Sequence, residues 1–128
     1  MTVEQTDAEF GESQEDLYLK LFSDFFNDTL NKATNKYSPW DYKGENYYYE
    51  LKSRKCLSST YPTTLIGADK FIKGLKQIFI FNFLDKILYI EKEELPTLET
   101  KKFKRTGNYV RKDYYFIPLS CLKILKTK

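Results

Sequence analysis

The chain has 128 residues, a formal net charge of +3 and no histidine. This length suits one domain, and an aromatic content of 17% supplies enough apolar surface for a core, which argues against global disorder. Without histidine there is no Ser-His-Asp or Cys-His catalysis, no zinc site built on imidazole and no nuclease of the His-Asn-His type. Any hydrolytic chemistry must depend on carboxylates, lysine, tyrosine or metal-activated water.

Charge is divided unevenly along the chain. Residues 1–30 hold eight acidic residues against one lysine, whereas residues 31–128 hold ten acidic residues against twenty Lys and Arg. The excess of positive charge in residues 31–128 suits a polyanionic partner, although an ordinary solvated, Lys-rich surface explains the same composition. Because no apolar run of about 18 residues and no signal-like N-terminus is present, we expect no membrane span and a soluble, intracellular protein.

The first predicted element is a helix that follows an acidic tail. Residues 1–12 are polar and lack periodicity, which predicts a flexible tail before a single domain of residues 13–128. Ser13-Gln14-Glu15-Asp16 has capping-box character and predicts a helix that runs to about Asn35. Glu15 falls within the broad apolar face of this helix.

A short strand, a turn and a longer strand come next. The run Tyr47–Ser53 is rich in β-forming residues, and Glu50 and Lys52 lie two apart on it, so their side chains share one face. Asp41 precedes the turn Lys43-Gly44-Glu45-Asn46, and a hairpin at this turn would return Asp41 to the side of Glu50. Two carboxylates and one ammonium at a strand edge would form a site for a hard cation such as Mg²⁺.

The rest of the chain predicts a second helix and several strands. The run Ile78–Phe83 is almost continuously apolar, as in a strand that is covered on both faces. The expected elements are, in order, a helix over Thr64–Lys76, strands over Gln77–Leu84 and Lys86–Glu91, a loop over Glu91–Arg105, a strand over Asn108–Ile117 and a short helix over Leu119–Leu125.

The spacing of Asp41, eight further residues and then Glu50-Leu51-Lys52 resembles the signature of the PD-(D/E)xK phosphodiesterase superfamily. The Pro-Asp pair of that signature occurs here with one inserted residue, as Pro39-Trp40-Asp41. The continuation through Ser53-Arg54, Tyr61-Pro62-Thr63-Thr64 and Ile66-Gly67 is similar to small nucleases of this type from large DNA viruses and phages. The resemblance extends over residues 13–90.

The resemblance implies an α/β (α+β) fold like that of restriction endonucleases. Its αβββαβ core would place a central mixed sheet between helices, here with a C-terminal β extension. It also implies a DNA endonuclease that uses metal-activated water. Asp41 and Glu50 would bind Mg²⁺ or Mn²⁺ together with the main-chain carbonyl of Leu51, Lys52 would act as the catalytic cation, and Glu15 would approach the metal. Many junction-cutting members act as homodimers, and a viral member would work in the host cytoplasm or nucleus.

Basic, aromatic and hydroxyl side chains near the predicted site are candidates for contacts with DNA. The phosphate-contact candidates are Arg54, Lys55, Lys70 and Lys73. Aromatic residues crowd the hairpin, where they would stack on unpaired bases or pack in the core, and Tyr48 shares the face of Glu50. Tyr61, Thr63 and Thr64 would line a cleft through their hydroxyl groups, or Thr64 would cap a helix.

Each assignment has a simpler alternative. Glu50 and Lys52 would form an ordinary ion pair on an exposed strand face. Glu15 would complement the helix dipole as a first-turn acid. For the whole protein, the alternatives are a catalytically inactive nucleic-acid-binding module on the same fold, and a protein–protein interaction domain that uses the acidic N-terminal helix.

Overall fold

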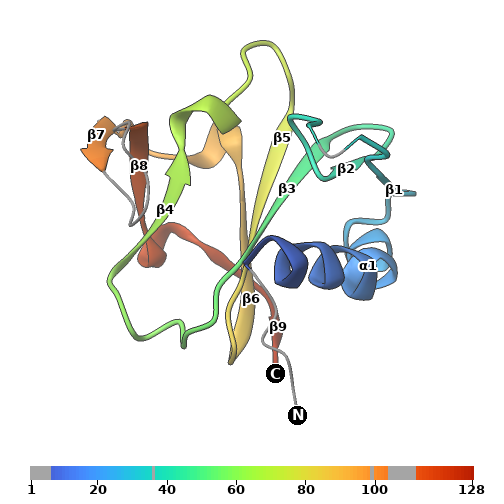
Figure 1. The fold of residues 1–128 in the computed structure, drawn as a ribbon, viewed down its shortest axis with the longest axis horizontal. Coiled ribbons are helices and arrows are strands. Elements are labelled where there is room, and N and C mark those ends of the chain that lie inside the picture. Colours follow the sequence, from blue (N-terminus) through green and yellow to red (C-terminus); the bar gives the residue numbers. More distant parts are fainter. Residues whose placement is uncertain (1–6, 36, 99, 104–111) are drawn as a thin grey trace.

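The computed structural model describes residues 7–35, 37–98, 100–103 and 112–128. These residues form an α+β arrangement of one α-helix, three 3₁₀ turns and two sheets (Figure 1). The elements are, in chain order, α1 (Asp7–Phe26), β1 (Asn31–Lys32), β2 (Tyr42–Lys43), β3 (Tyr48–Ser53), β4 (Thr63–Gly67), η1 (Ala68–Lys70), β5 (Gln77–Asn82), β6 (Lys86–Glu91), η2 (Lys92–Glu94), β7 (Thr100–Phe103), β8 (Lys112–Pro118), η3 (Leu119–Cys121) and β9 (Lys123–Thr127).

The larger sheet has six strands in the order β1-β2-β3-β5-β6-β9. Strands β3 and β5 run parallel, and the other neighbouring pairs are antiparallel, so the sheet is mixed. The three-stranded sheet has the order β4-β8-β7 and is antiparallel. The predicted central mixed sheet and the strands Tyr47–Ser53, Gln77–Leu84 and Lys86–Glu91 are confirmed, within one or two residues at their ends.

Strand β5 lies between two hydrophobic cores, and all six of its residues are buried. Ile78 and Ile80 point to the face covered by α1, where they pack in a cluster with Phe22. Phe79 and Phe81 point to the opposite face and pack in a second cluster with Ile66 of β4 and Ile117 of β8. Figure 1 shows α1 on one side of the larger sheet and the smaller sheet on the other. Because apolar groups cover both faces, the strand lacks alternating polarity.

Helix α1 begins and ends earlier than the sequence predicts. It starts at Asp7 rather than Ser13, so residues 7–12 of the predicted tail are helical, and residues 1–6 lie outside the described residues. It ends at Phe26 rather than near Asn35. Asn27 has a φ of 49°, and the amides of Asn27 and Asp28 donate to the carbonyls of Asp24 and Ser23. This pair of bonds is a Schellman motif, in which a left-handed residue ends a helix.

The predicted helix over Thr64–Lys76 is wrong. Strand β4 and the 3₁₀ turn η1 occupy its first half, and β4 pairs along its full length with β8. Pairing with a distant strand therefore outweighs the helical spacing of apolar residues in this segment. Gly74, with a φ of 85°, also opposes a continuous helix. The second helix of the expected αβββαβ core is thus absent from Thr64–Lys76, and the described part of the chain has a small sheet beside β5 instead.

The C-terminal part departs from the predictions in detail. Strand β7 lies in the segment predicted as loop, and the predicted terminal helix is wrong, because only a 3₁₀ turn precedes strand β9. The predicted strand over Asn108–Ile117 is observed as β8, while residues 108–111 lie outside the described residues. A C-terminal β extension is therefore present. No helix in the described part of the chain is long and apolar enough to span a membrane.

Candidate active site

The hairpin formed by β2 and β3 fixes the position of the candidate site. Buried Asp28 holds its turn: one carboxylate oxygen accepts a hydrogen bond from the Glu45 amide at 2.8 Å, and the other accepts one from the Tyr49 hydroxyl at 2.9 Å. Gly44 is required beside it, because a Cβ atom there would lie 1.9 Å from Asp28 Oδ2. Tyr42 of β2 pairs with Tyr49, which sets the register of the hairpin.

Asp41 immediately precedes β2, at the point where β3 extends beyond its pairing with that strand. Its amide donates to the Tyr49 carbonyl at 2.9 Å, and its carboxylate accepts a hydrogen bond from the Leu51 amide at 2.7 Å. The predicted return of Asp41 to the side of Glu50 is therefore confirmed. Because the N–H and C=O groups of a strand residue point to the same side, the Leu51 carbonyl faces this edge as well.

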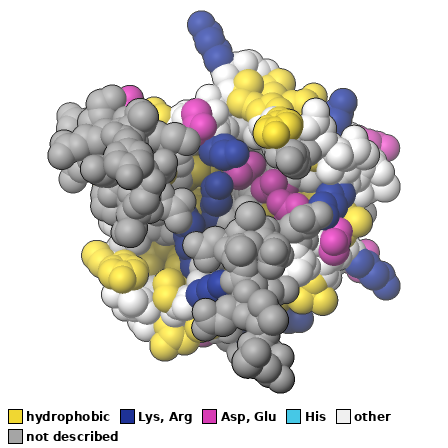
Figure 2. Space-filling model, in the orientation of Figure 1, with side chains coloured by type: hydrophobic (Ala, Val, Ile, Leu, Met, Phe, Trp, Pro, Cys, Tyr) yellow, Lys and Arg dark blue, Asp and Glu magenta, His cyan; other side chains and the backbone are white. Residues whose placement is uncertain are grey.

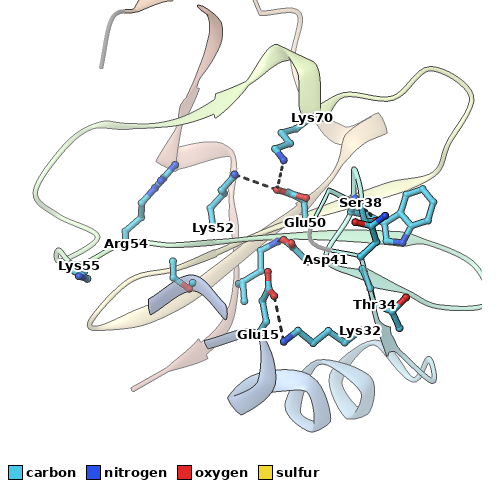
Figure 3. A pocket seen from close by; sticks show the side chains of 16 residues that line it. Glu15, Lys32, Thr34, Ser38, Asp41, Glu50, Lys52, Arg54, Lys55 and Lys70 are labelled. Atoms are coloured by element: carbon cyan, nitrogen blue, oxygen red, sulfur yellow. Dashed lines mark hydrogen bonds and ion pairs between the residues drawn. The ribbon is translucent and has the colours of Figure 1, made fainter. Parts of the chain in front are cut away.

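Glu50 is an acidic residue buried at the centre of the site, with 4% of its surface exposed. Its Oε1 atom lies 3.3 Å from Lys52 Nζ and 3.6 Å from Lys70 Nζ (Figure 3). Its Oε2 atom is buried and has no hydrogen-bond partner in the described part of the chain. Glu50 and Lys52 share a face of β3, as predicted. Their pairing is not the expected exposed ion pair, because Glu50 is buried and Lys70 joins from η1.

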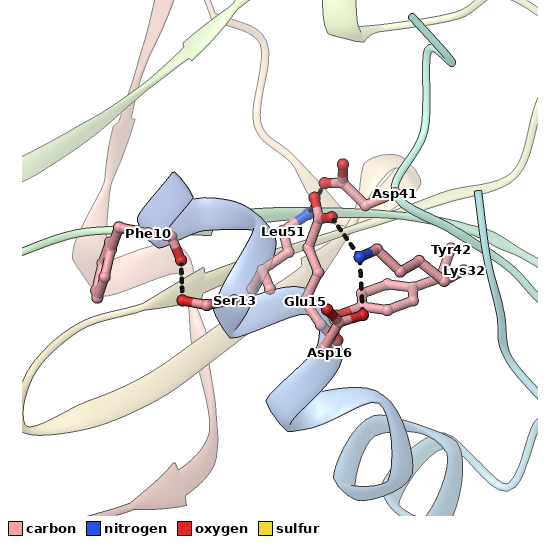
Figure 4. A network of polar contacts seen from close by, with 8 residues as sticks. All are labelled: Phe10, Ser13, Glu15, Asp16, Lys32, Asp41, Tyr42 and Leu51. Carbon is pink, nitrogen blue, oxygen red and sulfur yellow. Dashed lines mark hydrogen bonds and ion pairs between the residues drawn. The ribbon is translucent and has the colours of Figure 1, made fainter. Parts of the chain in front are cut away.

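Glu15 approaches the same edge from α1, on the other face of the sheet. Its carboxyl group points toward Asp41 (Figure 4) and lies 3.8 Å from Lys32 Nζ, which also binds Asp16 at 2.8 Å. The Tyr42 hydroxyl donates to the Glu15 carbonyl at 2.5 Å and ties the helix to the hairpin. The three carboxyl groups of Glu15, Asp41 and Glu50 thus surround the open edge of β3.

Electrostatics in the site favour protonated carboxyl groups. Burial, together with a hydrogen bond and charge repulsion from Asp41, raises the pKa of Glu15 to about 8, although Lys32 opposes this effect. Burial and repulsion from Asp41 likewise raise the pKa of Glu50 to about 7, against the opposing effect of Lys52 and Lys70. Carboxyl groups that are costly to ionise gain most from a nearby cation, because the cation offsets both burial and mutual repulsion.

A cleft of about 990 Å³ opens over these carboxyl groups. Figure 2 shows basic and acidic side chains gathered along the middle of one face of the molecule. Of the predicted phosphate contacts, Lys73 lies on an exposed turn and does not line the cleft. The charged residues that line it are Glu15, Lys32, Asp41, Glu50, Lys52, Arg54, Lys55 and Lys70.

Two basic side chains extend the cleft beyond Lys52. Arg54 reaches β4, where its guanidinium donates to the Leu65 carbonyl and, at 3.5 Å, to the Thr64 hydroxyl. Lys55 lies with its ammonium 4.9 Å from the centre of the Phe10 ring on α1. Both side chains therefore line the cleft while they contact residues outside its lining.

Several residues of the cleft were not predicted from the sequence. Lys32 belongs to β1, a segment predicted as the end of the first helix, and Thr34 and Ser38 follow it. The Asn27-Asp28 pair after an apolar helical face was the available signal, because asparagine readily ends a helix. Trp40 also lines the cleft, and its ring packs 4.4 Å from that of Tyr48.

The donor groups fit a hard divalent cation, but they do not form a complete cage. In the residues that the structure describes, no group of three or more His, Cys, Asp or Glu side chains is placed to hold a metal ion. Mg²⁺ is commonly bound by one or two carboxylates and completed by water and substrate phosphate, so Asp41 and Glu50 suffice. The buried, unpartnered Oε2 atom of Glu50 is the observation that favours a cation at this edge.

Comparison of the chain with protein-family models, with curated proteins and with solved structures finds no match. Assignment of a function therefore depends on the geometry and chemistry of the cleft itself.

Proposed function

We propose that the protein is a metal-dependent nuclease of the PD-(D/E)xK type that hydrolyses phosphodiester bonds in DNA. The observation that carries this proposal is the buried Glu50, whose Oε2 atom has no hydrogen-bond partner in the described residues while Asp41 lies at the same strand edge. A carboxylate of this kind is costly in a merely structural role, because an unpaired buried oxygen loses its hydration without compensation.

Asp41 and Glu50 would hold Mg²⁺ or Mn²⁺, with the Leu51 carbonyl as a further oxygen donor. When bound, such a cation would lower the pKa of a water molecule and partly neutralise the charge of the phosphate. Glu15, on the opposite face, would also favour a bound cation, because burial and then Asp41 oppose its own ionisation. We therefore expect the scissile phosphate to bind beside these three carboxyl groups, where the cation would offset its charge.

Lys52 would act on the reacting phosphate. Its ammonium lies on the same side of β3 as Glu50 and is partly exposed to the cleft. A lysine held 3.3 Å from a carboxylate keeps a fixed position from which it can orient the attacking water and donate to an oxygen that gains charge. Lys70, at 3.6 Å from the same oxygen, would hold Glu50 in place when Lys52 turns to substrate.

DNA is the proposed substrate because the cations of the cleft continue from Lys52 of β3 into the two residues that follow the strand. Arg54 and Lys55 follow Lys52 in the sequence and line the same cleft. Lysine and arginine side chains in a row bind successive phosphates without regard to sequence. The net balance of ten excess cations over residues 31–128 supports the same class of partner.

A nucleic-acid-binding module without catalysis is a second candidate. It is favoured by the two lysines that already pair with Glu50, and by the finding that no three acidic side chains in the described part of the chain are placed to hold a metal ion together. Such a module would bind DNA through the same cations and would not need a divalent ion.

Cleavage assays separate the two candidates. Plasmid and single-stranded DNA are incubated with the wild-type protein in Mg²⁺, in Mn²⁺ and in EDTA, beside Lys52→Ala and Lys73→Ala. Lys73→Ala is the matched control, because this lysine is exposed and outside the cleft. The nuclease proposal predicts cutting that requires the metal, survives in Lys73→Ala and is lost in Lys52→Ala while DNA binding persists. Equal behaviour of wild type and Lys52→Ala would contradict it.

A further inference from the structure

A second cleft of about 500 Å³ lies beside the first. The two clefts share Lys52 and Arg54, which therefore form their common border. Strands β4 and β8 supply most of the residues that line the second cleft. Its volume lies in the range of small-molecule sites.

The walls of the second cleft are aromatic and its charges are of one sign. Four aromatic rings line it: Tyr61, Phe83, Tyr114 and Phe116. Lys52 and Arg54 are the charged side chains in this lining, and both lie where it meets the first cleft. A ligand that fits this arrangement has a flat apolar part and an anionic part, and its anionic part faces the carboxylate site. A nucleotide unit has this composition.

Arg54 is held in a fixed position at the border. Its guanidinium donates to the Leu65 carbonyl and the Thr64 hydroxyl, both on the β4 wall. Figure 3 shows Lys52 of β3 and Arg54, just after it, pointing to the side from which Lys70 approaches. A phosphate bound between Lys52 and Arg54 would lie where the two clefts meet, within reach of a base of the same nucleotide in the aromatic cleft.

We propose that the second cleft binds an unpaired nucleobase of the strand whose phosphate lies in the first cleft. This inference rests on the proposed function and defines its substrate class as single-stranded or locally unpaired DNA. A base within a duplex is stacked and paired, so it enters a pocket only after it leaves the helix. Aromatic side chains bind bases of any sequence, because every base has a flat π surface.

Binding to intact and abasic strands tests the inference without cleavage. In EDTA, fluorescence anisotropy measures the affinity of the full chain for a short single-stranded DNA and for a strand of equal length made of abasic nucleotides. Both strands carry the same phosphates, so a difference between them reports base contacts. Stacking on an aromatic residue changes affinity roughly tenfold or more per base, so we expect the intact strand to bind about tenfold more tightly.

Tyr61→Ala is the variant that tests the pocket. Tyr61 is 64% exposed, so its removal leaves the core intact, and circular dichroism verifies the fold. We expect this variant to lose most of the preference for the intact strand. Tyr37→Ala is the control, because Tyr37 is 80% exposed and lines neither cleft. Equal affinities of the wild type for both strands, or an unchanged preference in Tyr61→Ala, would overturn the inference.

The two cysteines supply a measurement within the wild-type chain. Cys56 lines the second cleft, whereas Cys121 lines neither, and both are partly exposed free thiols. We expect the intact strand to slow alkylation of Cys56 by iodoacetamide and to leave Cys121 unaffected, with no slowing by the abasic strand. Equal protection by both strands would contradict base binding.

The outcomes for the pocket and for the nuclease are distinguishable. Metal-dependent cutting with no preference for intact over abasic strands would refute the base pocket and leave the proposed nuclease standing. A clear preference for the intact strand with no cutting in Mg²⁺ or Mn²⁺ would support the base pocket and refute catalysis.

Discussion

Replacement of Glu50 by glutamine isolates the energetic cost of its buried charge, because glutamine keeps the shape of the side chain and removes the carboxylate. Burial, and then repulsion from Asp41, raise the pKa of Glu50 from 4.5 to about 7 although Lys52 and Lys70 oppose them. One pKa unit corresponds to about 1.36 kcal/mol, so ionised Glu50 destabilises the metal-free protein by about 3 kcal/mol.

The sign of the pH dependence follows from the direction of the change. The pKa of Glu50 is higher in the folded than in the unfolded state, so protonated Glu50 favours folding. This contribution to the free energy of unfolding is complete below pH 4.5 and is lost as the pH rises through about 7. In EDTA, Glu50→Gln should leave the free energy of unfolding nearly unchanged at about pH 4 and raise it by about 3 kcal/mol at about pH 8. Urea unfolding measures both values.

The control variant is measured by the same urea unfolding experiment. Glu45→Gln changes an exposed glutamate of the same hairpin and should alter stability little at either pH. A Glu50→Gln variant less stable than the wild type at about pH 8 would mean that the ion pairs with Lys52 and Lys70 outweigh burial. An equal effect at both pH values would mean that shape rather than charge determines the difference.

Three further predictions concern the support of the site and its cation. Asp28→Ala leaves the Glu45 amide and the Tyr49 hydroxyl without their acceptor. The free energy of unfolding, measured in urea, should therefore fall by about 2–4 kcal/mol. An unchanged value would show that water replaces the carboxylate. Gly44→Ala places a methyl group 1.9 Å from Asp28 Oδ2, so it should destabilise the wild type more than it destabilises the Asp28→Ala protein. Additive changes in unfolding free energy for the two substitutions in a double-mutant cycle would refute the contact. Mn²⁺ should raise the melting temperature of the wild type at about pH 8 and leave that of Asp41→Asn unchanged, and an equal rise in both would place the ion elsewhere.

The hairpin and its site were predictable because they are local in sequence. A turn of Lys43-Gly44-Glu45-Asn46 between β-forming residues sets the register, and the register places Asp41 near Glu50. Glu15 was also found, because a helix face is read from its periodicity. The burial of Glu50 was not predictable, since Lys70, which contacts it, comes from a distant segment that was predicted as a helix.

The parts that failed depend on long-range pairing. The segment Thr64–Lys76 carries a helical pattern, yet pairing of Thr63–Gly67 with β8, about fifty residues later in the chain, makes it a strand. The second cleft was foreseen only as hydroxyl groups of Tyr61, Thr63 and Thr64, because its other wall comes from β8. Lys32 was missed because the predicted helix ran past its actual end at Phe26.

The most direct test of the account is the position of a bound cation. Crystals of the wild-type protein soaked in Mn²⁺ and measured at the manganese absorption edge should give an anomalous peak between the carboxylates of Asp41 and Glu50, within about 2–2.5 Å of an oxygen of each. The Glu50→Gln protein, treated in the same way, should lack this peak. Density that leaves Lys52 and Lys70 paired with Glu50 and places manganese elsewhere, or nowhere, would contradict the proposed metal site and the catalysis that depends on it.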